Sequence, residues 1–316
     1  MKLKIVFSAL AAAVGFSMMS IGASAASGVP VDSENFPDET FRSIVSENFD
    51  TDKDGFLSSD ESAAVRRLCC DECDITSLKG IGYFTELEEL ECEWNDLTEL
   101  DLSNNVRLEY LYCQDNRITR LNISKNKKLK ELECTNNRLT RLDVRSNTDL
   151  ECLSCGGNQL RHLDVSKNIW LETLFCEYNE LIKLDLSSNT GLEWLRCGNN
   201  KLIMIDLENN RWLETLDCSY NYLTHLDVRN NIQLKYLVCY NNFLTELDLS
   251  SNTRLYRLSC EENYITSLDL SNCSDFRCLD CDLDKITDLN ISGTNVDVDR
   301  LYDRDWDDED EEESED

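Results

Sequence analysis

The sequence predicts a repeat solenoid, right-handed and rich in β-strand, with about 11 coils behind a small helical N-terminal cap. Three observations predict this fold class. Cysteines recur every 21 residues without drift, the repeating unit divides into two similar halves, and residues 36–61 form a helix–loop–helix pattern ahead of the first unit. The recurring cysteines stand at positions 92, 113, 134, 155, 176, 197, 218, 239, 260 and 281.

The unit around each cysteine has the form L-x-x-L-x-C-x-x-N-x-L-x-x-L-D-L-S-x-N-x-x, as in residues 87–107, and its positions are numbered from the first leucine. Each half of the unit carries a short strand signal followed by an asparagine turn. In-register parallel strands lie about 4.8 Å apart, so every position becomes a column along the solenoid. We expect positions 1, 4, 6 and 11 to form a continuous core. The asparagine at position 9 should lie buried and bond the backbone of neighbouring coils.

Composition and the two ends of the chain indicate an exported protein. There are 62 acidic against 31 basic residues, and a net charge of −31 argues against a nucleic-acid partner. Lys2 and Lys4, an apolar run over 5–22 and Ala23-Ser24-Ala25 are typical of a signal peptide cut before Ala26. No later run is apolar enough to predict a membrane span. The predicted divisions are a signal peptide at 1–25, a cap at 26–64, a solenoid at 65–297 and an acidic disordered tail at 298–316.

Sixteen cysteines in a secreted protein first suggest disulfides, but the 21-residue period argues against them. Side chains in one column lie about 4.8 Å apart, beyond the roughly 3.8 Å between the Cβ atoms of a good disulfide. We therefore expect buried free thiols that act as small core residues. Cys69, Cys152 and Cys278 should lie on the exposed strand face, and Cys73 and Cys273 fall in the two asparagine columns.

The cap holds a candidate calcium loop between two predicted helices, the first over 36–49 with a proline near its start. The twelve residues from Asp50 to Glu61 match the spacing of a calcium-binding loop, with a glycine at its sixth position for the sharp turn. The predicted ligands are Asp50, Asp52, Asp54, Phe56 through its carbonyl, Ser58 and Glu61. The alternative is an acidic turn that caps the solenoid without metal. A bound Ca²⁺ would stabilise the cap.

These patterns resemble known families. The repeat resembles the short bacterial leucine-rich repeat over residues 65–297, although the first unit departs from the pattern with 22 residues. The helix–loop–helix resembles an EF-hand, and its placement, together with the segment 75–81, resembles internalin-type proteins. The resemblance implies a secreted or cell-surface bacterial protein with a leucine-rich repeat horseshoe fold.

The candidate ligand-binding surface is the concave strand face and its edge, at positions 3, 5, 7, 8 and 10 of each unit. Tyrosine and tryptophan give large contact area at low entropic cost, so their gathering there predicts a binding surface. The aromatic residues at these positions are Trp94, Tyr110, Tyr112, Phe175, Tyr178, Trp194, Tyr220, Tyr222, Tyr236, Tyr240, Phe243 and Tyr264. The alternative is that they only shield the strands.

The sequence therefore predicts a monomeric, non-enzymatic binding protein. Its partner would be a protein of a host or neighbouring-cell surface, and the alternative is a cell-envelope or glycan-binding module. No set of residues meets the geometry for catalysis, because the two histidines, His162 and His225, lie three units or about 14 Å apart. The aspartates at position 15 should bond local backbone donors, and a cation-binding ridge is the second interpretation of that column.

Overall fold

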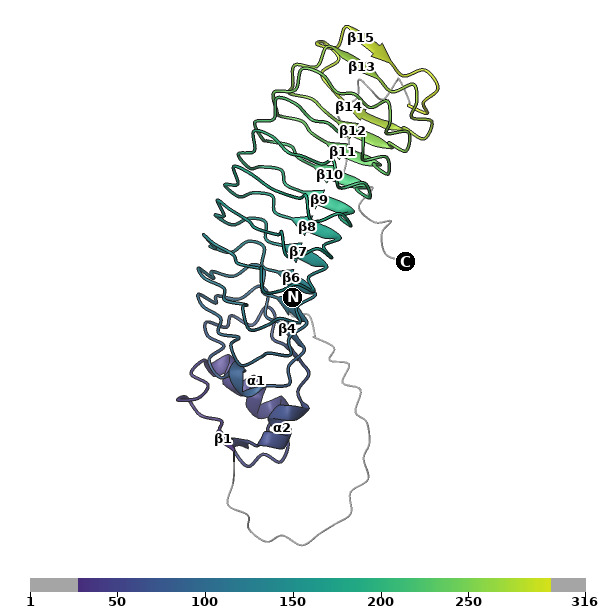
Figure 1. Ribbon diagram of the computed structural model, residues 1–316. Helices are drawn as coiled ribbons and strands as arrows, with labels where there is room; N and C mark the ends of the chain where they lie inside the picture. The colour runs from purple at the N-terminus through teal and green to yellow at the C-terminus, as the bar shows by residue number, and fades with distance from the viewer. Residues whose placement is uncertain (1–27, 297–316) are drawn as a thin grey trace.

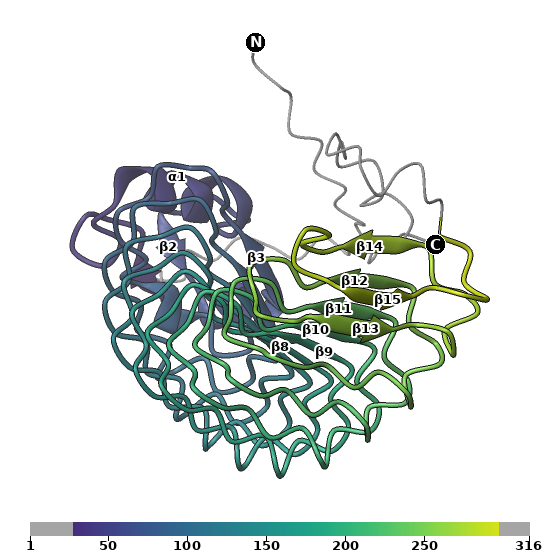
Figure 2. The ribbon, with the colours of Figure 1, turned by 90° about the horizontal axis from the view of Figure 1, so that it is seen from above.

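The computed structural model describes residues 28–296 as one continuous solenoid of stacked turns (Figure 1). One short strand per turn joins an eleven-stranded parallel sheet, so the predicted solenoid of about eleven coils is confirmed. Figure 2 shows these strands toward the inner side of the arc that the turns describe. In spatial order the strands are β3 (Arg67–Cys69), β4 (Glu89–Glu91), β5 (Tyr110–Tyr112), β6 (Glu131–Glu133), β7 (Cys152–Ser154), β8 (Thr173–Phe175), β9 (Trp194–Arg196), β10 (Thr215–Asp217), β11 (Tyr236–Val238), β12 (Arg257–Ser259) and β14 (Cys278–Asp280).

The strand register follows the sequence period. Leu90 pairs with Leu111, and the same 21-residue offset continues as far as the pairing of Leu258 with Leu279. The longer first unit appears as a 22-residue offset between Leu68 and Leu90. Because the register keeps each column intact, the leucine in the middle of every strand points into the core, where it is at most 5% exposed.

The cysteine column packs inside this core as predicted. Cysteines 92 to 239 of the column are fully buried, Cys260 is 3% exposed, and the ladder cysteines are free thiols. The prediction of a buried core residue is wrong for Cys281, which is only partly buried. It stands in the last turn of the sheet, where no further strand follows β14 to cover it.

The asparagines at position 9 form a hydrogen-bonded ladder, which confirms the expectation from sequence. Asn158 is typical: its Nδ2 donates to the carbonyls of Cys134, Cys155 and Gly156, at 3.0 to 3.1 Å. Its Oδ1 accepts from the backbone N–H of Leu139, at 2.9 Å. Each amide thus joins two successive turns and leaves no buried polar atom of its own unpaired.

The outer half of the unit, positions 11 to 21, forms little regular strand, which corrects the prediction of a strand in both halves. Among the described residues it contributes only β13 (Ser267–Asp269), β15 (Asp288–Asn290) and a bridge between Leu100 and Leu121. The outer half lies on the longer side of the arc, so neighbouring turns there separate beyond the roughly 4.8 Å that a ladder needs.

The cap covers the first turn. Helix α1 (Glu39–Asn48) starts later than predicted, because Asp38 caps it by accepting from the N–H of Phe41, at 3.0 Å. Helix α2 (Ser59–Ala64) begins with a capping box, in which Ser58 and Glu61 each accept from the other's backbone N–H. Strands β1 (Val29–Pro30) and β2 (Phe56–Leu57) pair with each other, and a 3₁₀ helix, η1 (Ile81–Tyr83), follows in the first unit.

Aromatic and polar contacts fix the cap to the solenoid. The rings of Phe49 and Phe84 lie 5.3 Å apart in an edge-to-face contact, and Asp38 also accepts from the N–H and hydroxyl of Thr76. Gly80, with φ of +104°, is required here: a Cβ would lie 2.4 Å from the Phe36 ring. The predicted signal peptide and acidic tail lie outside the described residues. Within 28–296, none of the helices is long and apolar enough to cross a bilayer.

Candidate binding surfaces

The strand face is the surface formed by positions 3, 5, 7, 8 and 10 of the repeating unit. Positions 3 and 5 lie on the strands, and positions 7, 8 and 10 follow each strand. All twelve aromatic residues predicted to bind a ligand lie outside the core, partly or fully exposed. The surface differs along its length: carboxylates dominate at the cap end and aromatic rings at the far end. The two ends therefore offer different chemistry to a partner.

Carboxylates crowd the cap end of the strand face. The acidic side chains at positions 3, 5 and 7 of the first four turns are Asp71, Glu89, Glu91, Glu93, Glu131 and Glu133. Arg67 is the one basic residue at those positions, and it pairs with Glu89 at 3.1 Å and with Glu91. Burial raises the pKa of Asp71, Glu93 and Glu133, and neighbouring carboxylates raise these pKa values further. This end carries negative charge that its own cations leave largely uncompensated.

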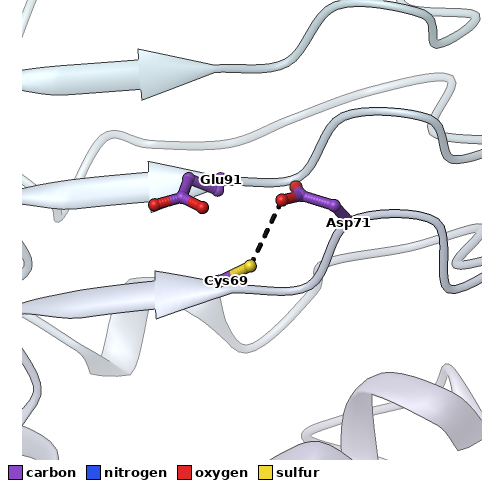
Figure 3. Close-up of side chains that lie close together, drawn as sticks. All are labelled: Cys69, Asp71 and Glu91. Carbon is purple, nitrogen blue, oxygen red and sulfur yellow. Dashed lines mark hydrogen bonds between the residues drawn. The ribbon is translucent and has the colours of Figure 1, made fainter. Parts of the chain in front are cut away.

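A thiol lies among these carboxylates, as Figure 3 shows for Cys69, Asp71 and Glu91. The Cys69 thiol donates to Asp71 Oδ2 at 3.2 Å, and one ligand atom from each of the three residues lies within 4.8 Å of the others. Burial and the hydrogen bond to Asp71 raise the pKa of Cys69 to about 12. Glu91 is already held by the Arg67 guanidinium, so a metal here would have to displace an ion pair.

Aromatic rings contact one another at the far end. Tyr220 and Tyr240 meet edge to face with ring centroids 5.1 Å apart. Tyr222, Phe243 and Tyr264 occupy position 10 of three consecutive turns and stack in a row, each 6.2 Å from the next. All three are at least 43% exposed. The solenoid repeat thus builds a continuous aromatic row on the surface.

Three of the aromatics sit where the backbone is left-handed. Position 8 has φ near +50° in successive turns, and Asn136, Gly157 or similar residues that tolerate this conformation occupy it in several of them. Trp94, Tyr178 and Tyr220 adopt the same φ with bulky side chains that are 44 to 63% exposed. A large aromatic residue costs free energy at such a φ, so local backbone preference does not explain its presence there.

The remaining predicted aromatics are dispersed. Arg196 lies over the Phe175 ring at 4.9 Å, and Lys130 lies over the Tyr110 ring at 5.9 Å. Trp194 and Tyr236 stand on strands β9 and β11, each about two-fifths exposed. Tyr112 lies on β5 beside the carboxylates, and burial raises its pKa. The structure therefore gathers many of the rings at the far end but leaves Trp94, Tyr110 and Tyr112 at the acidic end.

Exposed tryptophans also occur at the opposite edge of the sheet, and sequence reasoning missed them. Trp170 and Trp212, 64% and 60% exposed, occupy position 21, which leads into the strands, with Gly191 between them in the same column. Tyr256 was missed too; its ring contacts that of Tyr236 at 5.8 Å. The signal was in the sequence, because position 21 is otherwise polar or glycine in most units.

The candidate calcium loop brings three of its predicted ligands together. Carboxylate oxygens of Asp50, Asp52 and Asp54 lie within 4.8 Å of one another, and Gly55, with φ of +83°, makes the turn. Asp50 accepts from the N–H of Asp54 at 3.2 Å and of Gly55 at 3.0 Å, which orients its carboxylate. Three hard oxygen donors on one tight turn fit Ca²⁺.

Glu61, the predicted bidentate ligand, does not join that cluster. Its Oε1 accepts from the Thr51 N–H at 2.6 Å, and its Oε2 accepts from the Ser58 N–H at 2.9 Å. Burial acts to raise the pKa of Glu61, but the hydrogen bonds from Ser58 and Thr51 prevail and lower it to about 2. The backbone of Phe56 pairs in β2 with β1. The carboxylate of Glu61 thus clamps the two ends of the loop, and Ca²⁺ remains a prediction.

A groove of about 820 Å³ lies on the outer half of the first turns, away from the strand face. Asn35 and Lys79 line it from the cap side, and Glu99, Asp101 and Arg120 line it from the next two units. Its lining mixes polar side chains with apolar ones such as Leu78 and Ile81, and it contains none of the predicted ligand-binding aromatics or calcium ligands. His162 and His225 are both exposed and in different turns, so neither assembles a catalytic group with the other.

Comparison with known proteins supports the architecture. No family model matches the chain. Internalin J of Listeria monocytogenes serotype 4b (strain F2365) is 37% identical over 70 residues, which are 22% of this chain and 8% of that protein. The solved functional domain of InlJ from Listeria monocytogenes, which includes a cysteine ladder, superposes with a TM-score of 0.76 at 34% identity. The match covers 86% of this chain and 64% of that domain.

A second solved structure, the internalin InlF of Listeria monocytogenes str. 4b F2365, has a TM-score of 0.65 at 22% identity, covering 88% of this chain and 95% of that one. The fold is thus an internalin-like leucine-rich repeat solenoid, a scaffold that typically serves interaction rather than catalysis. The chain spans less than two thirds of the InlJ domain and a small part of Internalin J.

Proposed function

We propose that this chain is an exported binding protein whose strand face holds a protein partner at a host or neighbouring-cell surface. The observation that carries the proposal is the placement of the aromatics: they are exposed, they lie on one face, and three occupy left-handed positions that disfavour them. An aromatic residue kept at a strained, exposed backbone position does not help folding, so its presence there supports a role in contacting a partner. The signal-peptide pattern and the likeness to internalins support export.

The aromatic row favours a protein partner over the glycan alternative. Tyr222 and Tyr264 flank Phe243 with interplanar angles of 16° and 21°, so the rings turn their faces toward each other. Sugar rings bind best on aromatic faces that are open to solvent. Ring edges and hydroxyl groups beside carboxylates instead suit the mixed polar and apolar surface of a protein.

A pull-down with residues 26–316 against host-cell and bacterial-envelope extracts tests the proposal. Changing Tyr220, Tyr222, Tyr236 and Tyr240 to alanine should reduce retention of the partner more than about 30-fold, because anchoring aromatics dominate interface energies. The control changes Trp170 and Trp212, which are even more exposed but lie at the other edge, to alanine and should retain the partner. Equal retention by both variants, or loss only in the control, would contradict the proposal. A retained glycan would favour the alternative.

We also propose that Ca²⁺ binds Asp50, Asp52 and Asp54 and stabilises the cap. An isolated extracellular site of this type has a Kd of about 10⁻⁴–10⁻³ M, so about 5 mM Ca²⁺ would add roughly 1–2 kcal/mol to cap stability. Melting followed by circular dichroism should show a higher midpoint in Ca²⁺ than in EDTA. Asp52→Asn should abolish the difference, whereas Asp60→Asn, just outside the cluster, should keep it. An unchanged midpoint in the unmodified chain rejects a structural calcium.

A further inference from the structure

The strand face lacks cations of its own at the cap end. Of the six carboxylates at positions 3, 5 and 7 of the first four turns, only Glu89 and Glu91 take part in ion pairs among the described residues, both with Arg67. The carboxylate of Glu133 on β6 makes none of the ion pairs or side-chain hydrogen bonds seen there. Within residues 28–296, the carboxylate of Glu93 accepts only from the neutral amide of Gln114. Carboxylates that repel one another across neighbouring turns are stabilised by positive charge that approaches from outside the chain.

Rings on the same face already hold cations. Arg196 lies over Phe175, and Lys130, which also pairs with Glu109 at 2.8 Å, lies over Tyr110. Ring and cation attract each other because the negative face of the aromatic quadrupole meets the positive head group. In the described structure Trp194 and Tyr222 carry no such cation, although they are 39% and 50% exposed. This second observation, independent of the carboxylates, favours the same chemistry.

We propose that the protein partner presents a segment rich in lysine and arginine to the strand face. Its head groups would lie against Asp71, Glu93 and Glu133 at the cap end and against open rings such as Trp194 further along. The inference rests on the proposed function, since it names the chemistry of the partner at that surface. Charge complementarity of this kind sets orientation and association rate as well as affinity.

The probe is a fluorescein-labelled twelve-residue peptide of alternating arginine and serine, titrated with residues 26–316 at about 0.15 M salt and followed by anisotropy. With a net charge of −31 the chain will attract any polycation weakly, so the location of binding is the quantity to test. The strand-face variant is Glu93→Gln with Glu133→Gln. The matched control removes the same charge from exposed outer positions, with Glu99→Gln and Glu246→Gln.

We expect the strand-face variant to weaken peptide binding at least tenfold and the control less than twofold. Equal weakening by both variants would show bulk attraction to an acidic surface and overturn the inference. So would unchanged binding in the strand-face variant. Melting midpoints of both variants check that they fold.

The same variants separate this inference from the proposed function. If the partner found by pull-down is lost with the tyrosine variant but kept by Glu93→Gln/Glu133→Gln, the strand face binds protein without a basic segment. The inference then fails while the proposed function stands. If no partner depends on the strand face, the proposed function itself fails.

Discussion

The two halves of each repeat contain an asparagine at equivalent turns, yet the structure uses the two residues differently. In the strand half, Asn158 satisfies its amide completely with three donated bonds and one accepted bond. In the outer half, Asn168 is fully buried and donates to the carbonyls of Val144 and Asn147, at 3.0 and 2.6 Å. Its Oδ1 finds no donor among the described residues. The same holds for the other outer asparagines, Asn105, Asn126, Asn147, Asn189, Asn210, Asn231 and Asn252.

The difference shows where the solenoid is held most tightly. The sheet sets the spacing of the turns on the strand half, and the asparagine there bonds both turns at once. On the outer half the turns are free of a continuous ladder, and one acceptor per turn stays unpaired. A rigid strand half can carry costly side chains at its surface, such as Tyr178 with its left-handed backbone. That is the half on which we place partner binding.

Replacing the two asparagines by alanine should give the largest contrast in stability. Asn158→Ala leaves the buried N–H of Leu139 unpaired and takes one of the donors from three carbonyls, so we expect a loss of about 3 kcal/mol. Asn168→Ala removes two donated bonds but leaves no N–H unpaired, and the carbonyls of Val144 and Asn147 keep backbone donors, so we expect only about 1 kcal/mol. Urea unfolding followed by circular dichroism measures both changes. The two substitutions remove the same side-chain volume one half-repeat apart, so each is the control for the other. Equal losses would mean that the outer Oδ1 atoms are paired in solution, and the contrast between the halves would disappear.

The pH dependence of stability should also distinguish the two halves of the repeat. The effect is smaller than that of the asparagines and has opposite signs in the two halves. In the strand half burial raises the pKa of Glu133, Glu177 and Glu261. These groups bind protons more tightly when folded, so they favour folding less as pH rises above about 4.5. In the outer half hydrogen bonds from the residue two places on lower the pKa of the position-15 aspartates. The aspartates whose pKa is lowered in this way are Asp101, Asp143, Asp164, Asp185, Asp227, Asp248 and Asp269. Their contribution is complete above about pH 4 and is lost as pH falls further.

We therefore expect a melting midpoint a few degrees higher near pH 4.5 than at pH 8, and a fall below pH 4. Glu177→Gln removes one buried charge and should raise the midpoint at pH 8 but not at pH 5. Glu208→Gln, an exposed outer-half control, should leave the profile unchanged. A melting midpoint that rises steadily from pH 5.5 to 8 would show that burial does not raise the pKa of the strand-half carboxylates.

Much of the fold follows from the sequence because a 21-residue period fixes the columns. Cys176 and Asn179 had to be buried once their columns were assigned, and Asp185 had to bond Ser187, which it does at 3.0 Å. The aromatic positions were predictable for the same reason, since periodicity tells which side chains leave the core. Less predictable was the outer half, where strand formation depends on the curvature of the whole solenoid rather than on the residues of one unit.

The candidate sites show the same limit. The spacing of Asp50, Asp52 and Asp54 placed their carboxylates together, but it placed Glu61 with them as well. The structure instead directs the Glu61 carboxylate to the N–H groups of Thr51 and Ser58, which satisfy it at the two ends of the loop. Spacing placed Tyr222, Phe243 and Tyr264 in one column, but it did not predict that their rings stack or that Cys69 contacts Asp71.

The sequence by itself determined the period, the buried columns and the face that carries the aromatics and acids, because each depends only on a side chain's place within a repeating unit. The tertiary structure decided which of those side chains meet. Whether two rings stack, a carboxylate finds a cation or an amide oxygen finds a donor depends on the distance between neighbouring turns. That distance is set by the sheet and by the curvature of the assembled solenoid.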